Sequence, residues 1–217
     1  MTTLYDNLHD LFNSKKRFQF PYYNEIDSIP LNGIYLMFEN GEKYKNWDRI
    51  VRVGTHTGKN QLRSRLFQHY LNQNKNRSIF RKHIGRAILN KNNNPYLAIW
   101  NMDSTSRVDR IKNECLIDKN FENGLEIQIS NYIQGNISFS VFEVLEKEDR
   151  IFWESRIIST LAGFHDIKPS DQWLGLFSPK SRIQDYGLWQ INKLFNKPLD
   201  LKEFDILTRL TLKCNST

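Results

Sequence analysis

The residue with the strongest reason to do chemistry is Glu154. In residues 147–163 (KEDRIFWESRIISTLAG), Glu154 falls in the middle of an apolar stripe with helical spacing, made by Ile151, Ile157, Ile158 and Leu161. Burying an unpaired carboxylate costs several kcal/mol. The side chain must therefore bind a metal ion or a cationic group, accept hydrogen bonds, or take up a proton. The plain alternative is a structural ion pair with an arginine.

Three further residue types could handle a phosphate or a proton. Arg65 and His69 are four residues apart in a helical segment, so they share one face, where they could hold a phosphate oxygen and accept a proton. His56 follows a strand-like run. Tyr35 lies beside Gly33, whose missing side chain allows another group to come close. Each also has an interpretation without a role in chemistry: Arg65 and His69 lie on a solvated helix flank, His56 is a surface loop histidine, and Tyr35 is a packing residue.

Positive charge is concentrated in one window. Between Arg49 and Met102 the chain has eleven lysines and arginines and no aspartate or glutamate. This window predicts polyanion binding. The net charge of +7 admits a nucleic acid, an anionic membrane surface or an acidic protein as partner. A membrane surface would need the charges on one amphipathic helix, whereas here they spread over helices, a strand and loops, which suits a phosphate backbone.

The elements that must position these residues follow from periodicity and turn signals. Strands are expected at 32–39, 49–55 and 137–145, with a possible short strand at 96–100. Helices are expected at 3–13, 60–72, 77–89, 106–136 in two pieces divided near 120–124, 147–163 and about 200–213, with an irregular stretch at 165–189. We therefore expect an α+β fold with a small, three-stranded, mainly antiparallel sheet flanked by helices.

We expect one domain for residues 1–217. Its core would comprise residues 30–73 and 137–164. A basic helical insertion would occupy 74–136, and a C-terminal helical extension would occupy 165–217. No run approaches the roughly 18 to 20 apolar residues of a membrane span, and the N-terminus lacks the pattern of a secretion signal. This predicts a cytoplasmic protein with no membrane partner.

The order of these residues resembles the GIY-YIG endonuclease family. Gly33-Ile34-Tyr35 matches the first signature, Val53-Gly54-Thr55 ends the next strand, Arg65 lies in the following helix and Glu154 in a later one. Further segments resemble a restriction-type bacterial branch with Arg-x-x-x-His in its first core helix: 52–56, 65–69, 78–81, 173–175 and 187–189. The resemblance implies a GIY-YIG-like fold for the α+β domain.

Two features depart from the family pattern. Arg52 stands where the second signature tyrosine is expected, and an arginine that stays protonated binds phosphate but cannot act as a base. Residues 74–136 also separate the first helix from the third strand, which the minimal family module places close together. Because this insertion carries much of the basic window, we expect it to recognise the substrate.

The resemblance implies hydrolysis of a DNA phosphodiester with one Mg²⁺ (or Mn²⁺), held by Glu154 as its only protein ligand. Arg65 and Arg52 would neutralise phosphate oxygens. Tyr35 would orient or deprotonate the attacking water, with His69 or His56 accepting the proton; we favour His69. The residues expected to contact the DNA backbone are Lys59, Lys75, Arg77, Arg81 and Lys82.

Other functions stay open on the sequence. An arginine at position 52 in place of the signature tyrosine is also compatible with a protein that is built on the same module and binds DNA or RNA without cleaving it. A structural factor that contacts RNA or protein would need Lys75, Arg77, Arg81 and Lys82 but not the Glu154 carboxylate. For a nuclease, double-stranded DNA is the expected partner, and a homodimer would cut both strands of a palindrome.

Overall fold

A small antiparallel sheet organises the protein. The computed structural model describes residues 2–102, 106–164 and 167–212. Strands β1 (Gly33–Tyr44), β2 (Trp47–Gly54) and β3 (Ile137–Glu143) form a three-stranded sheet in the order β2-β1-β3, and both pairings are antiparallel. This confirms the expected α+β fold.

Both faces of the sheet are buried, which explains the apolar run in β1. Side chains alternate along the strand, so Ile34 and Leu36 enter one core while Tyr35 and Met37 enter the other. Gly33 is required at the start of β1 because a Cβ there would lie 2.3 Å from the Phe142 carbonyl oxygen on β3. The sheet thus separates two hydrophobic cores.

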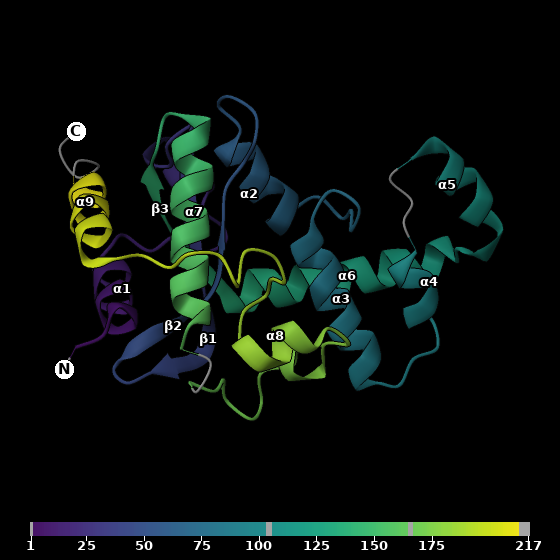
Figure 1. Ribbon diagram of the computed structural model, residues 1–217. Coiled ribbons are helices and arrows are strands. Elements are labelled where there is room, and N and C mark those ends of the chain that lie inside the picture. Colours follow the sequence, from purple (N-terminus) through teal and green to yellow (C-terminus); the bar gives the residue numbers. More distant parts are fainter. Residues whose placement is uncertain (1, 103–105, 165–166, 213–217) are drawn as a thin grey trace.

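Helices cover each face (Figure 1). The core that holds Leu36 is completed by α1 (Leu4–Asn13), α7 (Lys147–Ala162) and α9 (Leu201–Leu212). The core that holds Tyr35 is completed by α2 (Leu62–Tyr70), α3 (Ile79–Lys91) and α6 (Lys119–Asn136). None of the described helices combines the length and apolar character that crossing a bilayer requires.

The outer edge of β2 is closed by segments from both ends of the chain. From α1, His9 Nε2 accepts a hydrogen bond from the Ile50 amide at 3.2 Å. Residues 188–193, called the strap below, run along the same edge: the Trp189 amide donates to the Val51 carbonyl at 2.7 Å, and the Val53 amide donates to Gln190 Oε1 at 3.0 Å. An edge strand with its amides satisfied cannot recruit another strand.

Two expectations about the insertion were wrong. Residues 96–100 are not a strand, because α4 (Leu97–Asn101) turns Trp100 onto α3, where its indole donates to the Lys82 carbonyl at 3.1 Å. The helical stretch 106–136 is interrupted earlier than residues 120–124. Helix α5 (Arg107–Asn113) and the 3₁₀ turn η2 (Glu114–Leu116) come before α6. Helix α6 begins after its N-cap Asp118, which accepts a hydrogen bond from the Phe121 amide at 3.0 Å. In Figure 1, α5 lies at the far end of the molecule from α9.

The stretch 165–189, expected to be irregular, contains short helical turns in its described part; residues 165–166 lie outside the described residues. These turns are η3 (Leu174–Phe177) and α8 (Ser181–Tyr186), and η1 (Tyr23–Ser28) is a third, before the sheet. The indoles of Trp173 and Trp189 both donate to Glu39 Oε2 at 2.8 Å, and Tyr132 donates to the other oxygen. Glu39 therefore joins the sheet, the insertion and the C-terminal extension.

Candidate active site

A buried hydrogen-bonded chain joins the first signature tyrosine to the first core helix. The Tyr35 hydroxyl lies 2.8 Å from His69 Nε2, and His69 Nδ1 lies 2.7 Å from Ser78 Oγ. Ser78 is the N-cap of α3 and also accepts from the Arg81 amide at 3.2 Å. Tyr35 and Ser78 can each donate or accept, so the imidazole can carry its proton on either nitrogen. The chain can therefore move a proton between its ends.

Gly54 makes room for this chain. A Cβ at residue 54 would lie 2.2 Å from the Tyr35 hydroxyl, and Gly54 is paired with Tyr35 across the β1–β2 ladder. The glycine of the second signature thus allows the tyrosine of the first signature to reach His69.

The surroundings of His69 keep its ring neutral. Burial is the main reason that the pKa of His69 lies well below its ordinary value, and the positive charges of Arg65, Arg52 and Arg81 lower it further. A neutral imidazole can accept a proton. A bound phosphate would offset those charges, raising the pKa of His69 and making it a stronger base.

Arg52 is a buried arginine without a carboxylate partner among the described residues. Only 6% of the residue is exposed; Nη1 donates to the Trp189 carbonyl at 2.5 Å, and Nε has no partner. The guanidinium lies over the Phe80 ring, with its carbon 5.1 Å from the ring centre. It is on the same sheet face as Tyr35, because its partner across the ladder is Met37. An unbalanced buried cation is suited to an anionic ligand.

Arg65 also keeps donors for a ligand. Its Nη1 donates to Gln68 Oε1 and to the Arg77 carbonyl, both at 2.8 Å, and no ion pair involves it in the described part of the chain. The bond to Arg77 fixes the guanidinium between α2 and the first loop of the insertion. Its Nε and Nη2 have no hydrogen-bond partner within residues 2–102, 106–164 and 167–212, so both can donate to a phosphate oxygen.

His56 has a structural role, which argues against using it as the base. Its Nδ1 donates to the Gly58 carbonyl at 2.7 Å, and its Nε2 accepts from the Gly33 amide at 3.2 Å. Burial lowers its pKa, and the charge of Arg150 adds to this effect. Since both ring nitrogens are engaged by the backbone, His56 fixes the loop after β2 against the start of β1.

Glu154 lies at the edge of the apolar face of α7, and the expectation of a central position was wrong. The buried face is formed by Trp153, Ile157 and Leu161, while Ile151 is exposed. The Glu154 side chain is 15% exposed and forms an ion pair with Lys193. The carboxylate therefore faces a cation at the protein surface.

The strap connects Glu154 to the other candidate residues. Its Trp189 carbonyl receives Arg52, its Gln190 side chain receives the Val53 amide, and its Lys193 pairs with Glu154. Within the described residues, Glu154 has no hydrogen bond or ion pair with Tyr35, Arg65 or His69. The helix that carries Glu154 packs on the core that holds Leu36, whereas Tyr35 faces the other core, so the strap links a carboxylate and a tyrosine–histidine pair that lie on different faces of the sheet.

The Tyr35–His69 pair is closed to solvent, with both residues fully buried. A cavity of about 760 Å³ lies at the other end of β1, and its charged lining residues are Glu39, Glu42, Asp171 and Lys91. That acidic lining is unsuited to a phosphate backbone. A substrate phosphate reaches Tyr35 only if a covering element moves.

The basic window does not form the expected continuous DNA-facing surface. Lys59 and Arg77 are exposed, but Lys75, Arg81 and Lys82 are buried. Lys75 pairs with Glu122 and lies over the Trp100 ring, and Lys82 donates to the Met102 carbonyl at 3.1 Å. The expected surface position of Lys75, Arg81 and Lys82 was wrong, because glutamates of α6 pair with Lys75 and Arg81 and the Met102 carbonyl receives Lys82.

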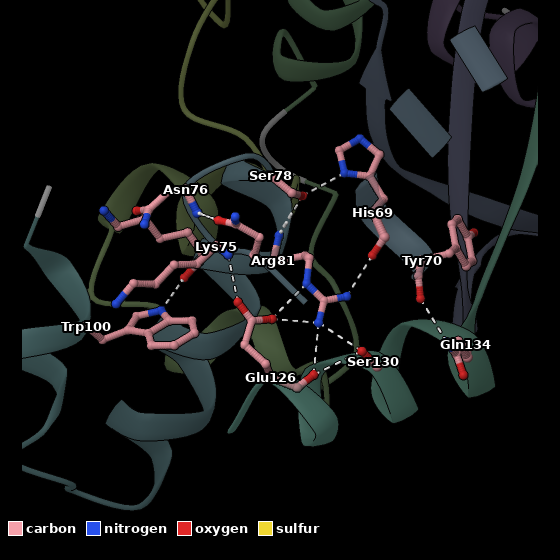
Figure 2. Close-up of polar contacts among 12 residues, drawn as sticks. His69, Tyr70, Lys75, Asn76, Ser78, Arg81, Trp100, Glu126, Ser130 and Gln134 are labelled. Atoms are coloured by element: carbon pink, nitrogen blue, oxygen red, sulfur yellow. Dashed lines mark hydrogen bonds and ion pairs between the residues drawn. The ribbon is translucent and has the colours of Figure 1, made fainter. Parts of the chain in front are cut away.

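Arg81, expected to contact DNA, is the clearest example of a basic residue that instead forms a buried ion pair (Figure 2). Its guanidinium donates twice to Glu126 Oε2, at 2.8 and 2.6 Å, and to Ser130 Oγ at 2.9 Å. Its Nη1 donates to the backbone carbonyl of His69 at 2.9 Å. Arg81 therefore connects α6 of the insertion to the helix that carries the candidate base.

The geometry on β1, β2 and α2 agrees with a comparison of the sequence. Residues 1–217 match the profile of the GIY-YIG domain. The chain belongs to the GIY-YIG family. Neither a curated protein nor a solved structure matches it. GIY-YIG nucleases act on DNA, which agrees with the arginines that surround His69 in this GIY-YIG domain.

The sequence did not reveal the contribution of Ser78 to this GIY-YIG site. Ser78 lies in the insertion, nine residues after His69, and contacts its ring. The available signal was the serine directly before the helical run 79–91, which predicts a cap. That signal gives no indication that the same hydroxyl also reaches an imidazole.

Proposed function

We propose that this GIY-YIG domain hydrolyses phosphodiester bonds of double-stranded DNA, as a restriction- or defence-type endonuclease that uses Mg²⁺ or Mn²⁺. The observation that carries the proposal is the Tyr35–His69 hydrogen bond, which lies beside two arginines that have no carboxylate partner among the described residues. This combination offers a proton acceptor next to unbalanced positive charge, as attack on a phosphate diester requires.

Arg52 and Arg65 would hold the non-bridging oxygens of the scissile phosphate. Both charges act on His69, so a phosphate held between them would lie close to the imidazole. The Tyr35 hydroxyl would orient the attacking water, and His69 would take the water's proton as the new P–O bond forms and the bond to the leaving oxygen breaks. Ser78 would hold the ring through Nδ1 in either tautomer.

Glu154 is suited to hold the metal ion. Mg²⁺ keeps several waters and needs only one or two carboxylates when phosphate oxygens complete its shell. Glu154 is a partly exposed carboxylate that already faces a positive charge from Lys193. When bound, the ion would stabilise the negative charge on the leaving oxygen. The Lys193 ammonium would have to release the Glu154 carboxylate when the ion binds.

A second function is favoured by the burial of the site. Tyr35 and His69 have no solvent access, and Arg52 replaces a tyrosine. A protein that binds DNA without cleaving it would have no need to open this pair. Such a binder would shift DNA in the absence of metal and would never nick it.

The deciding experiment is incubation of the purified protein with plasmid and phage genomic DNA, with Mg²⁺ or with EDTA, followed by mapping of any ends. We expect Mg²⁺-dependent cleavage that Glu154→Gln or Tyr35→Phe lowers at least about a hundredfold. Glu203→Gln is the matched control, because Glu203 is a similarly shielded partner of Arg156. Full activity of Glu154→Gln would refute the assignment, and binding without nicking would support the second function.

Lys193→Met tests the metal position separately. Removing the ammonium that competes for Glu154 should lower the Mg²⁺ concentration at half-maximal rate by up to about fivefold, the value of a partly exposed ion pair. Lys197→Met, which removes an exposed lysine from the same segment, should leave that concentration unchanged. An unchanged requirement in Lys193→Met would contradict metal binding at Glu154.

A further inference from the structure

A row of basic side chains runs along α3, away from the candidate centre. Arg52 lies over Phe80, and His83 and Arg86 follow at three-residue steps on the same helix. Residues three apart are neighbours on a helix surface, so the row passes from Arg52 to His83 to Arg86. The positive charges of Arg86, Arg52, Lys180 and Lys82 all reach the buried His83 ring.

Two hydrogen-bond donors in the row have no partner among the residues that the structure describes. Arg86 Nη1 lies 3.1 Å from His83 Nδ1, and because an arginine only donates, the histidine proton must lie on Nε2. Arg86 Nε donates to Asn101 Oδ1 at 2.6 Å, which fixes the guanidinium. His83 Nε2 and Arg86 Nη2 have no hydrogen-bond partner in the part of the chain that the structure describes.

Within the described residues, no carboxylate balances this row. Among the described residues, no ion pair includes Arg52, His83, Arg86 or Lys180, although His83 and Arg86 are almost completely buried. Two other buried arginines have a carboxylate partner, Arg49 with Glu42 and Arg81 with Glu126. Buried Arg150 has no ion pair within the described residues, but its Nη1 donates to the carbonyls of Val144 and Leu145. Burying like charges without a counterion is costly, so a cluster of this kind is suited to an external anion.

We propose that His83, Arg86 and Lys180 form a second phosphate subsite, which binds the backbone of the DNA strand next to the phosphate held by Arg52. Lys180 is the residue directly before α8, and its charge acts on His83; the 3₁₀ turn η3 contacts both α3 and α8. The subsite rests on the proposed function for its ligand. It assigns positioning of the DNA strand to the insertion, through His83 and Arg86 of α3 and not through Arg81, whose charge is neutralised by Glu126.

The test is DNA binding measured without cleavage. Fluorescence anisotropy of a labelled DNA duplex in EDTA, over a series of KCl concentrations, gives the slope of log K against log salt. Each phosphate contact contributes about 0.9 to this slope. Arg86→Gln should therefore lower the slope by about 0.9 and weaken binding at low salt roughly tenfold. Arg209→Gln, an exposed arginine on the distant α9, is the matched control and should change neither value.

If Arg86→Gln does not fold, Lys180→Gln still tests the subsite, because Lys180 is exposed and its replacement leaves the packing of the protein unchanged. It should also lower the slope, with an unchanged melting temperature. Equal slopes for wild type, Arg86→Gln and Lys180→Gln would overturn the subsite even if the wild type cleaves DNA. Lower slopes in a protein that never nicks DNA with Mg²⁺ would support the subsite and reject the nuclease. Absence of any DNA binding would reject both.

Discussion

At the scale of single residues, the Tyr35 hydroxyl depends on the absence of a side chain at Gly54. The two residues face each other across the β1–β2 ladder, and the hydroxyl occupies the space that a Cβ would take. Backbone sterics on one strand thus set the distance between a phenol on the next strand and an imidazole on α2. The same contact explains why two short signatures separated in sequence belong to one site.

Gly54→Ala should displace Tyr35 from His69. A Cβ would lie 2.2 Å from the hydroxyl, and overpacking of this kind costs about 1–3 kcal/mol of unfolding free energy. Urea denaturation measures that loss, and the rate of plasmid cleavage should fall at saturating DNA. Gly124→Ala is the matched control: its Cβ would meet nothing within 4 Å in the middle of α6, so stability should rise by about 0.5–1 kcal/mol. Equal stability changes in the two variants would contradict the contact.

The residue types of the site could be predicted from sequence, but their pairing could not. Tyr35, Arg65 and His69 follow from signature order and helical spacing. The structural role of His56 depends on a carbonyl and an amide that approach its ring only after the loop folds. The partner of Glu154 is a lysine 39 residues away, which no periodic pattern reveals.

At the scale of elements, α6 stabilises α2 through one buried ion pair. Arg81 connects the Glu126 carboxylate to the backbone carbonyl of His69. The sequence shows eleven positive charges in a window without carboxylates, and the neutralising glutamate comes from a helix outside that window. Local pattern therefore predicted most helices and the three strands, while long-range pairing decided which charges face solvent.

Glu126→Leu should destabilise the protein by about 3–5 kcal/mol, because it leaves the Arg81 charge buried and unpaired. Arg81→Met combined with Glu126→Leu should recover most of that loss in urea denaturation, since an apolar pair replaces the ion pair. DNA cleavage should stay low in the double variant because His69 loses the contact from Arg81. Glu114→Gln, which removes an exposed ion pair with Lys119, should change stability by less than about 0.5 kcal/mol. Additive losses in the double variant would contradict this account.

At the scale of the whole molecule, His9 couples stability to pH by bridging α1 and β2. Its Nε2 accepts from Ile50 and its Nδ1 donates to Tyr5, so the folded protein needs a neutral ring. Burial lowers the pKa of His9 to about 4. In the unfolded chain an imidazole has a pKa near 6.5, so on acidification the unfolded state takes up the proton first. The stability that the neutral ring contributes is therefore lost as the pH falls from about 6.5 to about 4.

His9→Gln should remove this pH dependence. The stability advantage of the wild type over the variant should be full at pH 7 and should shrink by about 3 kcal/mol by pH 4, with urea denaturation at each pH as the measurement. Comparing the two proteins cancels the contributions of the other titrating groups. A constant difference across this range would show that His9 titrates normally in the folded state.

The closure of β2 by the strap has a consequence for synthesis. The hydrogen-bond acceptor of the Val53 amide is Gln190, which is synthesised 137 residues later in the chain. At roughly 5–20 residues per second, translation takes roughly 7 to 27 seconds to supply it. During that interval the nascent chain carries an apolar strand with an open edge, which is a template for pairing with other chains. Ribosome-bound chains that stop short of the strap should therefore be strong clients of chaperones, while chains that include it should be released.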